Sequence, residues 1–144
     1  MSLDAPYEDG NIFAKIIAGE LPCVKVWEDE KTLCFMDIFP QSEGHCLVIP
    51  KTAKATNLLA ADAETLAETI LATQKIAAAV VASLKPDGVR IAQFNGAPAG
   101  QTVFHLHFHV VPAYEGANER PHASGAQADP QALAAIAEKI KAAL

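Results

Sequence analysis

Residues 105–112 read HLHFHVVP, a stretch in which histidine alternates with apolar residues. Successive side chains of a β-strand point to opposite faces, whereas a helix would scatter the same residues around its circumference. The alternation therefore predicts a strand, from about Thr102 to Val111, with one apolar face in a core and one face of imidazoles. At about 3.3 Å per residue, neighbouring histidines of such a strand lie roughly 6.6 Å apart. The histidines on this face are His105, His107 and His109.

One long segment, from Asp62 to Lys85, has a helical pattern instead. It is rich in Ala, Leu, Glu and Ile, and it is followed by Pro86-Asp87-Gly88, so it predicts a single long helix that ends there. The apolar residues at helical spacing predict the helix face that meets the core. These residues are Leu66, Ile70, Ala77, Val80 and Leu84.

Shorter elements surround these two. A short helix should begin at Asn11, a favoured helix cap, and end at Gly19. A last helix should begin after Asp129, with Pro130 at its first position, and residues 113–129 before it look irregular. We expect further strands at 23–28, 32–38, 45–50 and 89–94. This order predicts an α+β fold: an antiparallel sheet of about five strands with one long helix and a short N-terminal helix, in one domain over residues 1–144.

The composition excludes several classes of protein. A net charge of −6 without any block of like charges argues against a nucleic-acid partner. The acidic N-terminus MSLDAPYEDG has no apolar run, and no stretch approaches the roughly 18 apolar residues of a membrane span, so we expect neither a signal peptide nor a membrane partner. Cys23, Cys34 and Cys46 lie in apolar segments, which favours buried free thiols and a cytoplasmic location.

Two kinds of chemistry fit the histidine row. Two imidazoles at positions i and i+2 of a strand can share one zinc ion, so His105 and His107 would form a metal site if a Cys, Asp or Glu joined them. Alternatively, the row handles phosphate, because a neutral imidazole is a nucleophile and a protonated one pairs with phosphate oxygens.

The residues before the row favour phosphate. The loop NGAPAGQ holds two glycines, which let backbone N–H groups approach an anion closely, and Gln101 and Thr102 add neutral donors. No acidic residue lies between Asp87 and Glu115. The stretch therefore lacks a carboxylate that would repel phosphate, or that a hydrolytic zinc site often uses.

These residues resemble the histidine triad, or HIT, family of nucleotide hydrolases and transferases. The family signature is three histidines separated by single apolar residues, then two more apolar residues, and residues 105–111 match it throughout. The resemblance extends over residues 11–112 and implies the family's fold and a homodimer. Three further blocks resemble the family and stand in the family's order: IFAKIIAGELP, FMDIFPQSEGHCLVIPK and NGAPAGQTVFH.

The resemblance implies a role for each histidine of the site. His107 would attack the α-phosphate of a purine nucleotide and form a covalent nucleotidyl-histidine, from which water would release the nucleoside monophosphate. His105 would hold the ring of His107 through its backbone carbonyl, and His109 would contact the phosphate. His45, in the second block, would be a fourth site histidine that supports the phosphate-binding residues.

The same resemblance assigns residues to the rest of the nucleotide. Asp37 would accept hydrogen bonds from the ribose hydroxyls, and Thr102 would lie near the leaving group. A site amide found in related enzymes falls at Phe94 or Asn95, and we favour Asn95. The base would lie in an apolar cleft formed by Ile12, Phe13, Ile16, Phe35 and Ile38.

The chain also departs from the family pattern. Many bacterial members hold a structural zinc through Cys-x-x-Cys where this chain has Asn11-Ile12-Phe13-Ala14, and through a histidine where it has Ala53. Because these ligands are missing together, we expect no metal and no cofactor. His109 in place of glutamine argues against the uridylyltransferase branch, and the acidic charge and absent finger motif argue against the DNA-end-repair branch. His122 has no evident partner and should be exposed to solvent.

We therefore expect a cytoplasmic nucleotide hydrolase, closest to the bacterial nucleoside phosphoramidase-like branch of the family. It would cleave phosphoramidates or other phosphate-linked nucleotides at the α-phosphate. Two alternatives remain: a dinucleoside polyphosphate hydrolase, and a nucleotide-binding signalling module with little turnover.

Overall fold

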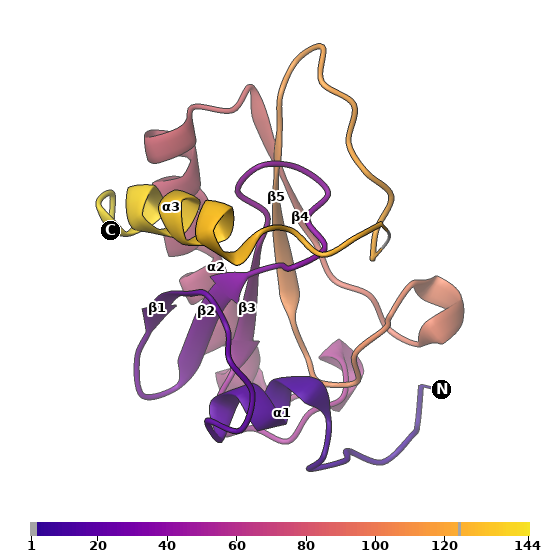
Figure 1. The fold of residues 1–144 in the computed structure, drawn as a ribbon. Coiled ribbons are helices and arrows are strands. Elements are labelled where there is room, and N and C mark those ends of the chain that lie inside the picture. The colour runs from indigo at the N-terminus through magenta and orange to yellow at the C-terminus, as the bar shows by residue number, and fades with distance from the viewer. Residues whose placement is uncertain (1–2, 124) are drawn as a thin grey trace.

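A computed structural model describes residues 3–123 and 125–144. The strands form one antiparallel sheet in the order β1-β2-β3-β5-β4 (Figure 1). They are β1 (Lys25–Glu28), β2 (Thr32–Met36), β3 (Cys46–Pro50), β4 (Gly88–Ala92) and β5 (Phe108–Ala113). The helices are α1 (Ile12–Ile17), α2 (Ala63–Leu84) and α3 (Pro130–Lys141), with 3₁₀ turns η1 (Leu58–Ala60) and η2 (Ala97–Ala99). The predicted α+β fold, with one antiparallel five-stranded sheet and one long helix, is confirmed.

The sheet is covered on both faces. On one face, which we call the helix side, α2 and α3 pack against the strands in an apolar cluster that includes Val48, Ile76 and Val110 (Figure 1). On the other face, which we call the histidine side, Phe13 of α1 joins Phe35 and Leu47 in a second cluster. His109 pairs with Leu47 in the strand register, and directly opposite residues of antiparallel strands share a face. The triad therefore lies on the side of the sheet that faces α1.

Threonines form much of the α2 face that meets the sheet. The expected face included Ile70, which is exposed, and Val80 is its only fully buried member. The observed buried face consists of Thr65, Thr69, Ala72, Thr73, Ile76, Ala79 and Val80. A threonine hydroxyl can be buried in a helix when it donates to the carbonyl one turn earlier. Thr69 and Thr73 do so, at 2.7 and 2.8 Å. Apolar spacing alone could not identify this face.

The length and composition of α2 also bear on membranes. Among the described residues, α2 is the one helix long and apolar enough to cross a bilayer, which corrects the expectation that no stretch reaches that length. The buried face of α2 packs on the sheet, as the core helix of a folded domain does.

Side-chain caps begin the three helices where the sequence predicts them. The carboxylate or amide oxygens of Asn11, Asp62 and Asp129 accept from the backbone N–H groups of the first turns of α1, α2 and α3. The Asn11 side chain is used by the cap of α1, where its Oδ1 accepts from the Ala14 N–H at 2.9 Å.

Candidate active site

The histidine segment is a bent backbone that becomes a strand only at Phe108. Residues 103–105 form a bend, so His109 alone lies in the regular strand, and the predicted strand from Thr102 is wrong in its first half. The physical reason is a different backbone partner, because the Leu106 N–H donates to the Ala55 carbonyl at 2.8 Å, outside the sheet. The rings of His107 and His109 still lie together, with centroids 5.0 Å apart.

His105 is buried, and both its ring nitrogens are engaged. Nε2 lies 2.9 Å from the Pro50 carbonyl, which can only accept, so the ring proton is on Nε2. Nδ1 then accepts from the Tyr7 hydroxyl at 2.8 Å. Tyr7 belongs to the site, although nothing in the sequence around it marks it. Since His105 keeps no free nitrogen, it cannot share a zinc ion with His107.

His107 has one ring nitrogen held and one without a partner. Its Nδ1–H donates to the His105 carbonyl at 2.6 Å, so its lone pair is on Nε2, which has no hydrogen bond among the described residues. The edge-on ring of Phe13 lies 5.0 Å from its ring centroid. Burial lowers the pKa of His107 to about 4, so the imidazole is neutral at pH 7. A neutral imidazole with an unengaged, oriented lone pair is a nucleophile.

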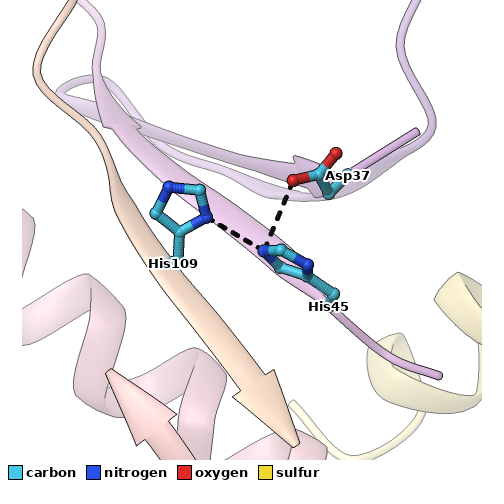
Figure 2. A group of neighbouring side chains, drawn as sticks. All are labelled: Asp37, His45 and His109. Atoms are coloured by element: carbon cyan, nitrogen blue, oxygen red, sulfur yellow. Dashed lines mark hydrogen bonds and ion pairs between the residues drawn. The ribbon is translucent and has the colours of Figure 1, made fainter. Parts of the chain in front are cut away.

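His45, His109 and Asp37 form a linked group (Figure 2). The ring of His107 lies next to it, against His109. The Gln41 N–H donates to His45 Nδ1 at 3.0 Å, so His45 carries its proton on Nε2. That N–H lies 2.9 Å from His109 Nδ1 and 3.3 Å from the Asp37 carboxylate. His109 therefore accepts at Nδ1 and carries its own proton on Nε2. Burial, with repulsion from neighbouring histidines, lowers the pKa of His109 to about 2.

The Asp37, His45 and His109 ligand atoms lie within 4.8 Å of one another, close enough in principle for a metal ion. A metal on His45 Nε2 would move the ring proton to Nδ1, where it would meet the Gln41 N–H at 3.0 Å. Two donors cannot face each other at that distance. The group therefore fits a hydrogen-bonded chain and does not fit a metal site in this conformation.

His122 lies against the triad, and the expectation that it is exposed and without a partner is wrong. Its ring centroid is 4.9 Å from those of His109 and Phe94, and its Nε2–H donates to the Gly100 carbonyl at 3.1 Å. Two buried ring nitrogens, His109 Nε2 and His122 Nδ1, have no partner among the described residues. A buried polar atom without a partner costs roughly 1–3 kcal/mol, so this pair marks a place where a ligand would be bound.

The side-chain amides of the loop before the histidines form hydrogen bonds within the loop and to neighbouring segments. The Gln101 amide accepts from Gly96 N–H and donates to the carbonyls of Thr56 and Val103. The Asn95 amide pairs with Gln93 and accepts from the Leu58 N–H. A phosphate oxygen would need an amide N–H, and Gln101 already donates to two carbonyls while Asn95 donates to Gln93, so the phosphate-binding role of these residues stays a prediction.

Two other residues near this loop were expected to take part in the site. Thr102 is exposed, and its hydroxyl has no partner among the described residues. Phe94, the alternative to Asn95 for the family's amide position, packs on His109 with ring centroids 5.4 Å apart. The alternative position therefore presents an aromatic ring to His109, while the amide of the favoured Asn95 accepts from the Leu58 N–H in η1.

The residues expected to contact the base divide into a buried and an exposed group. Phe13 and Phe35 are buried and pack edge to face, with centroids 5.3 Å apart, and Ile16 packs against the same cluster. Ile12 and Ile38 are exposed, at 54% and 41%. The exposed isoleucines are accessible to an apolar ligand, whereas Phe35 lies in the core, so the base-binding role of these residues stays a prediction.

The chain is similar to known proteins over most of its length. The family model described as HIT domain matches residues 18–116. "Protein hit" of Bacillus subtilis is 45% identical over 72% of this chain and 70% of its own length. An adenosine 5′-monophosphoramidase of Schizosaccharomyces pombe is 41% identical over 70% of this chain and 72% of its own. The crystal structure of a HIT-like protein from Bartonella henselae superposes with a TM-score of 0.90 and 48% identity, covering 97% of this chain and 100% of that one.

Proposed function

Because the chain belongs to the HIT domain family, we propose that it is a nucleotide hydrolase that cleaves phosphoramidate or other phosphate-linked nucleotides at the α-phosphate. The name of the fission yeast relative, a monophosphoramidase, supports a phosphorus–nitrogen bond as the bond cleaved. The substrate would be a purine nucleotide, in keeping with the adenosine in that name.

One observation carries the proposal: the lone pair of His107 Nε2 is unengaged while the opposite nitrogen of the same ring is held by the His105 carbonyl. The held Nδ1–H fixes the ring orientation, and the low pKa keeps the ring unprotonated. Nε2 would attack phosphorus and form a nucleotidyl-histidine while the bond to the leaving group breaks. Water would then displace His107 and release the nucleoside monophosphate.

Neighbouring groups would stabilise the charge that develops at phosphorus. His109 presents an Nε2–H without a protein partner, suited to a phosphate oxygen. His45 donates its Nε2–H to His109 Nδ1 and has the Asp37 carboxylate beside the same N–H, so these two residues fix the tautomer of His109. Asp37 Oδ1 accepts from the Phe39 N–H, and the remaining acceptor sites of this carboxylate suit ribose hydroxyls.

The experiment that tests the proposal is a substrate panel with capture of the intermediate. Purified protein is mixed with adenosine phosphoramidates and with diadenosine polyphosphates, and the acid-quenched protein is analysed by intact mass and peptide mapping. We expect turnover with an adenylyl group on His107 and faster cleavage of the phosphoramidates. Faster cleavage of diadenosine polyphosphates would favour the polyphosphate hydrolase, and nucleotide binding without turnover would favour the signalling module.

We also propose that the chain is a homodimer through β4 and the exposed side of α2. β4 is an edge strand, and it exposes Val89 and Ile91. An exposed apolar edge strand is a template for pairing with another strand. Leu71 of α2 is 62% exposed, which extends the apolar surface. Light scattering should give a dimer mass, and Ile91→Lys should shift it toward a monomer.

A cytoplasmic location is the remaining part of the proposal. Cys34 and Cys46 are buried free thiols and Cys23 is a partly buried one, which suits a reducing compartment. Cell fractionation with an antibody to the native chain should recover the protein with cytoplasmic markers.

A further inference from the structure

Four of the five histidines, His45, His107, His109 and His122, form one continuous group of rings, and His105 joins them through its backbone carbonyl, which accepts from His107. Their hydrogen bonds assign the proton of each. His45 and His105 have both ring nitrogens engaged. Among the described residues, three ring nitrogens have no partner: the lone pair of His107 Nε2, the N–H of His109 Nε2 and the lone pair of His122 Nδ1. The site thus offers a nucleophile, a hydrogen-bond donor and one further base.

Hydrogen bonds at two nearby residues, Arg120 and Ala128, fix the position of His122. Arg120, two residues earlier, donates its N–H to the Gln41 carbonyl at 2.8 Å, and the Gln41 side chain donates to the Arg120 carbonyl at 3.3 Å. Further along, the Ala128 N–H donates to the Ile38 carbonyl. The segment is therefore tied to the loop between β2 and β3, and the ring of His122 is held between Phe94 and His109.

The hydrogen bonds exclude the other histidines as carriers of a proton during turnover. His107 uses its lone pair for the attack. His109 could accept a second proton only at Nδ1, where the His45 N–H already points. His45 accepts from the Gln41 N–H, and His105 accepts from Tyr7. His122 alone can take a proton on Nδ1 without losing a hydrogen bond, because its Nε2–H to Gly100 remains.

We propose that His122 is a catalytic proton-transfer residue that serves both halves of the reaction, an inference that rests on the proposed function. In the first half, the His107 Nε2 lone pair forms the bond to phosphorus, and the electron pair of the broken bond goes to the leaving group. His122 has first bound a solvent proton on Nδ1, and the leaving group takes this proton. In the second half, a water oxygen bonds to phosphorus, the Nε2–phosphorus electron pair returns to His107, and the water proton goes to His122 Nδ1.

The test compares two leaving groups, one of which needs no proton. Wild type, His122→Ala and His122→Gln are mixed rapidly with an alkyl phosphoramidate of AMP and with the p-nitrophenyl ester of AMP. An amine leaves only when protonated, so both variants should cleave the phosphoramidate about 10²-fold more slowly than wild type. Nitrophenolate leaves unprotonated, so the ester should keep its initial burst, followed by slow release of AMP and a nucleotidyl-enzyme seen by mass. Added imidazole should restore part of the phosphoramidate rate in His122→Ala.

His122→Gln separates a chemical role from a structural one. Glutamine can still donate to the Gly100 carbonyl but cannot transfer a proton, so wild-type rates in this variant would overturn the inference. A burst lost together with the phosphoramidate rate would also overturn it, since a distorted site slows both substrates alike. Arg90→Ala is the control, because it breaks the 2.6 Å pair with Glu119 on the same segment and changes no histidine. It should keep the wild-type ratio between the substrates.

Failure of the proposed function can be told apart from failure of the inference alone. If wild type cleaves neither substrate, the proposed function fails and the inference fails with it. If wild type cleaves both and the His122 variants match it, the proposed function stands and only the inference falls.

Discussion

The helix side and the histidine side of the sheet both bury polar groups, but they satisfy them in different ways. On the helix side, Thr69 and Thr73 donate to carbonyls four residues earlier in the same helix. On the histidine side, His105 is paired with Pro50 and Tyr7, 55 and 98 positions away in sequence. Local partners make a polar group part of one helix. Distant partners make the site depend on the whole fold, and the unpaired nitrogens that remain are the ones to which we assign the chemistry.

The largest effect should come from removing the nucleophile on the histidine side. His107→Ala should lower turnover by at least about 10⁴-fold, or about 5 kcal/mol in the barrier, because it removes the ring nitrogen that we propose bonds to phosphorus. Steady-state kinetics measure the loss, and circular dichroism checks the fold. Turnover within tenfold of wild type by a folded variant would contradict the assignment of His107.

A truncation on the helix side should have the opposite effects: a lower stability and a nearly unchanged turnover. Ile76 is fully buried between α2 and the sheet, so Ile76→Ala should lower the free energy of unfolding by about 2–5 kcal/mol. Urea titration measures this loss. The turnover of the folded fraction should stay within a few fold of wild type, and a loss as large as that of His107→Ala would mean that the two sides are not separable.

Acid should weaken the histidine side selectively. The folded-state pKa of His107 is lowered to about 4 and that of His109 to about 2, below their ordinary value near 6.5, so the unfolded chain binds more protons below that value. Stability from these groups is complete above about pH 6.5 and falls as the pH drops toward 4, by about 3 kcal/mol for His107 alone. Urea titrations between pH 7 and 4 should show a shallower fall in His109→Gln, and parallel curves would refute this account.

The smallest effect should come from a polar group with a local partner. Thr69→Val removes a buried hydroxyl whose acceptor is the Thr65 carbonyl of the same helix, and that carbonyl also accepts the ordinary helical hydrogen bond. We expect less than about 1 kcal/mol of lost stability and unchanged kinetics. Loss of more than about 2 kcal/mol in urea titration would mean that the helix side also depends on its polar groups.

The sequence predicts the parts of the site that follow local rules. Alternation at His107 and His109 and the helix caps at Asn11, Asp62 and Asp129 depend only on near neighbours. The bend at 103–105 was missed because it arises from the Leu106 bond to Ala55, far away in the chain.

The remaining misses have the same physical origin. The buried side of α2 contains threonines, whose polarity hides their place from hydrophobic spacing. His122 and Tyr7 reach the triad through chain paths that no local pattern encodes. Asn95 belongs to an Asn-Gly turn pair, but its side chain accepts from the Leu58 N–H in η1. Phe94 beside it packs against the ring of His109.

The hydrogen bonds of Gln41 matter for any redesign of this protein, because they connect Arg120 with His45. Its backbone carbonyl accepts from the Arg120 N–H, and its side chain donates to the Arg120 carbonyl. Its own N–H sets the proton position of His45. Exchanging residues 113–129 for those of a relative would therefore also perturb the tautomer of His45. Grafts that retain this glutamine and its two hydrogen bonds to the Arg120 backbone would leave that tautomer in place.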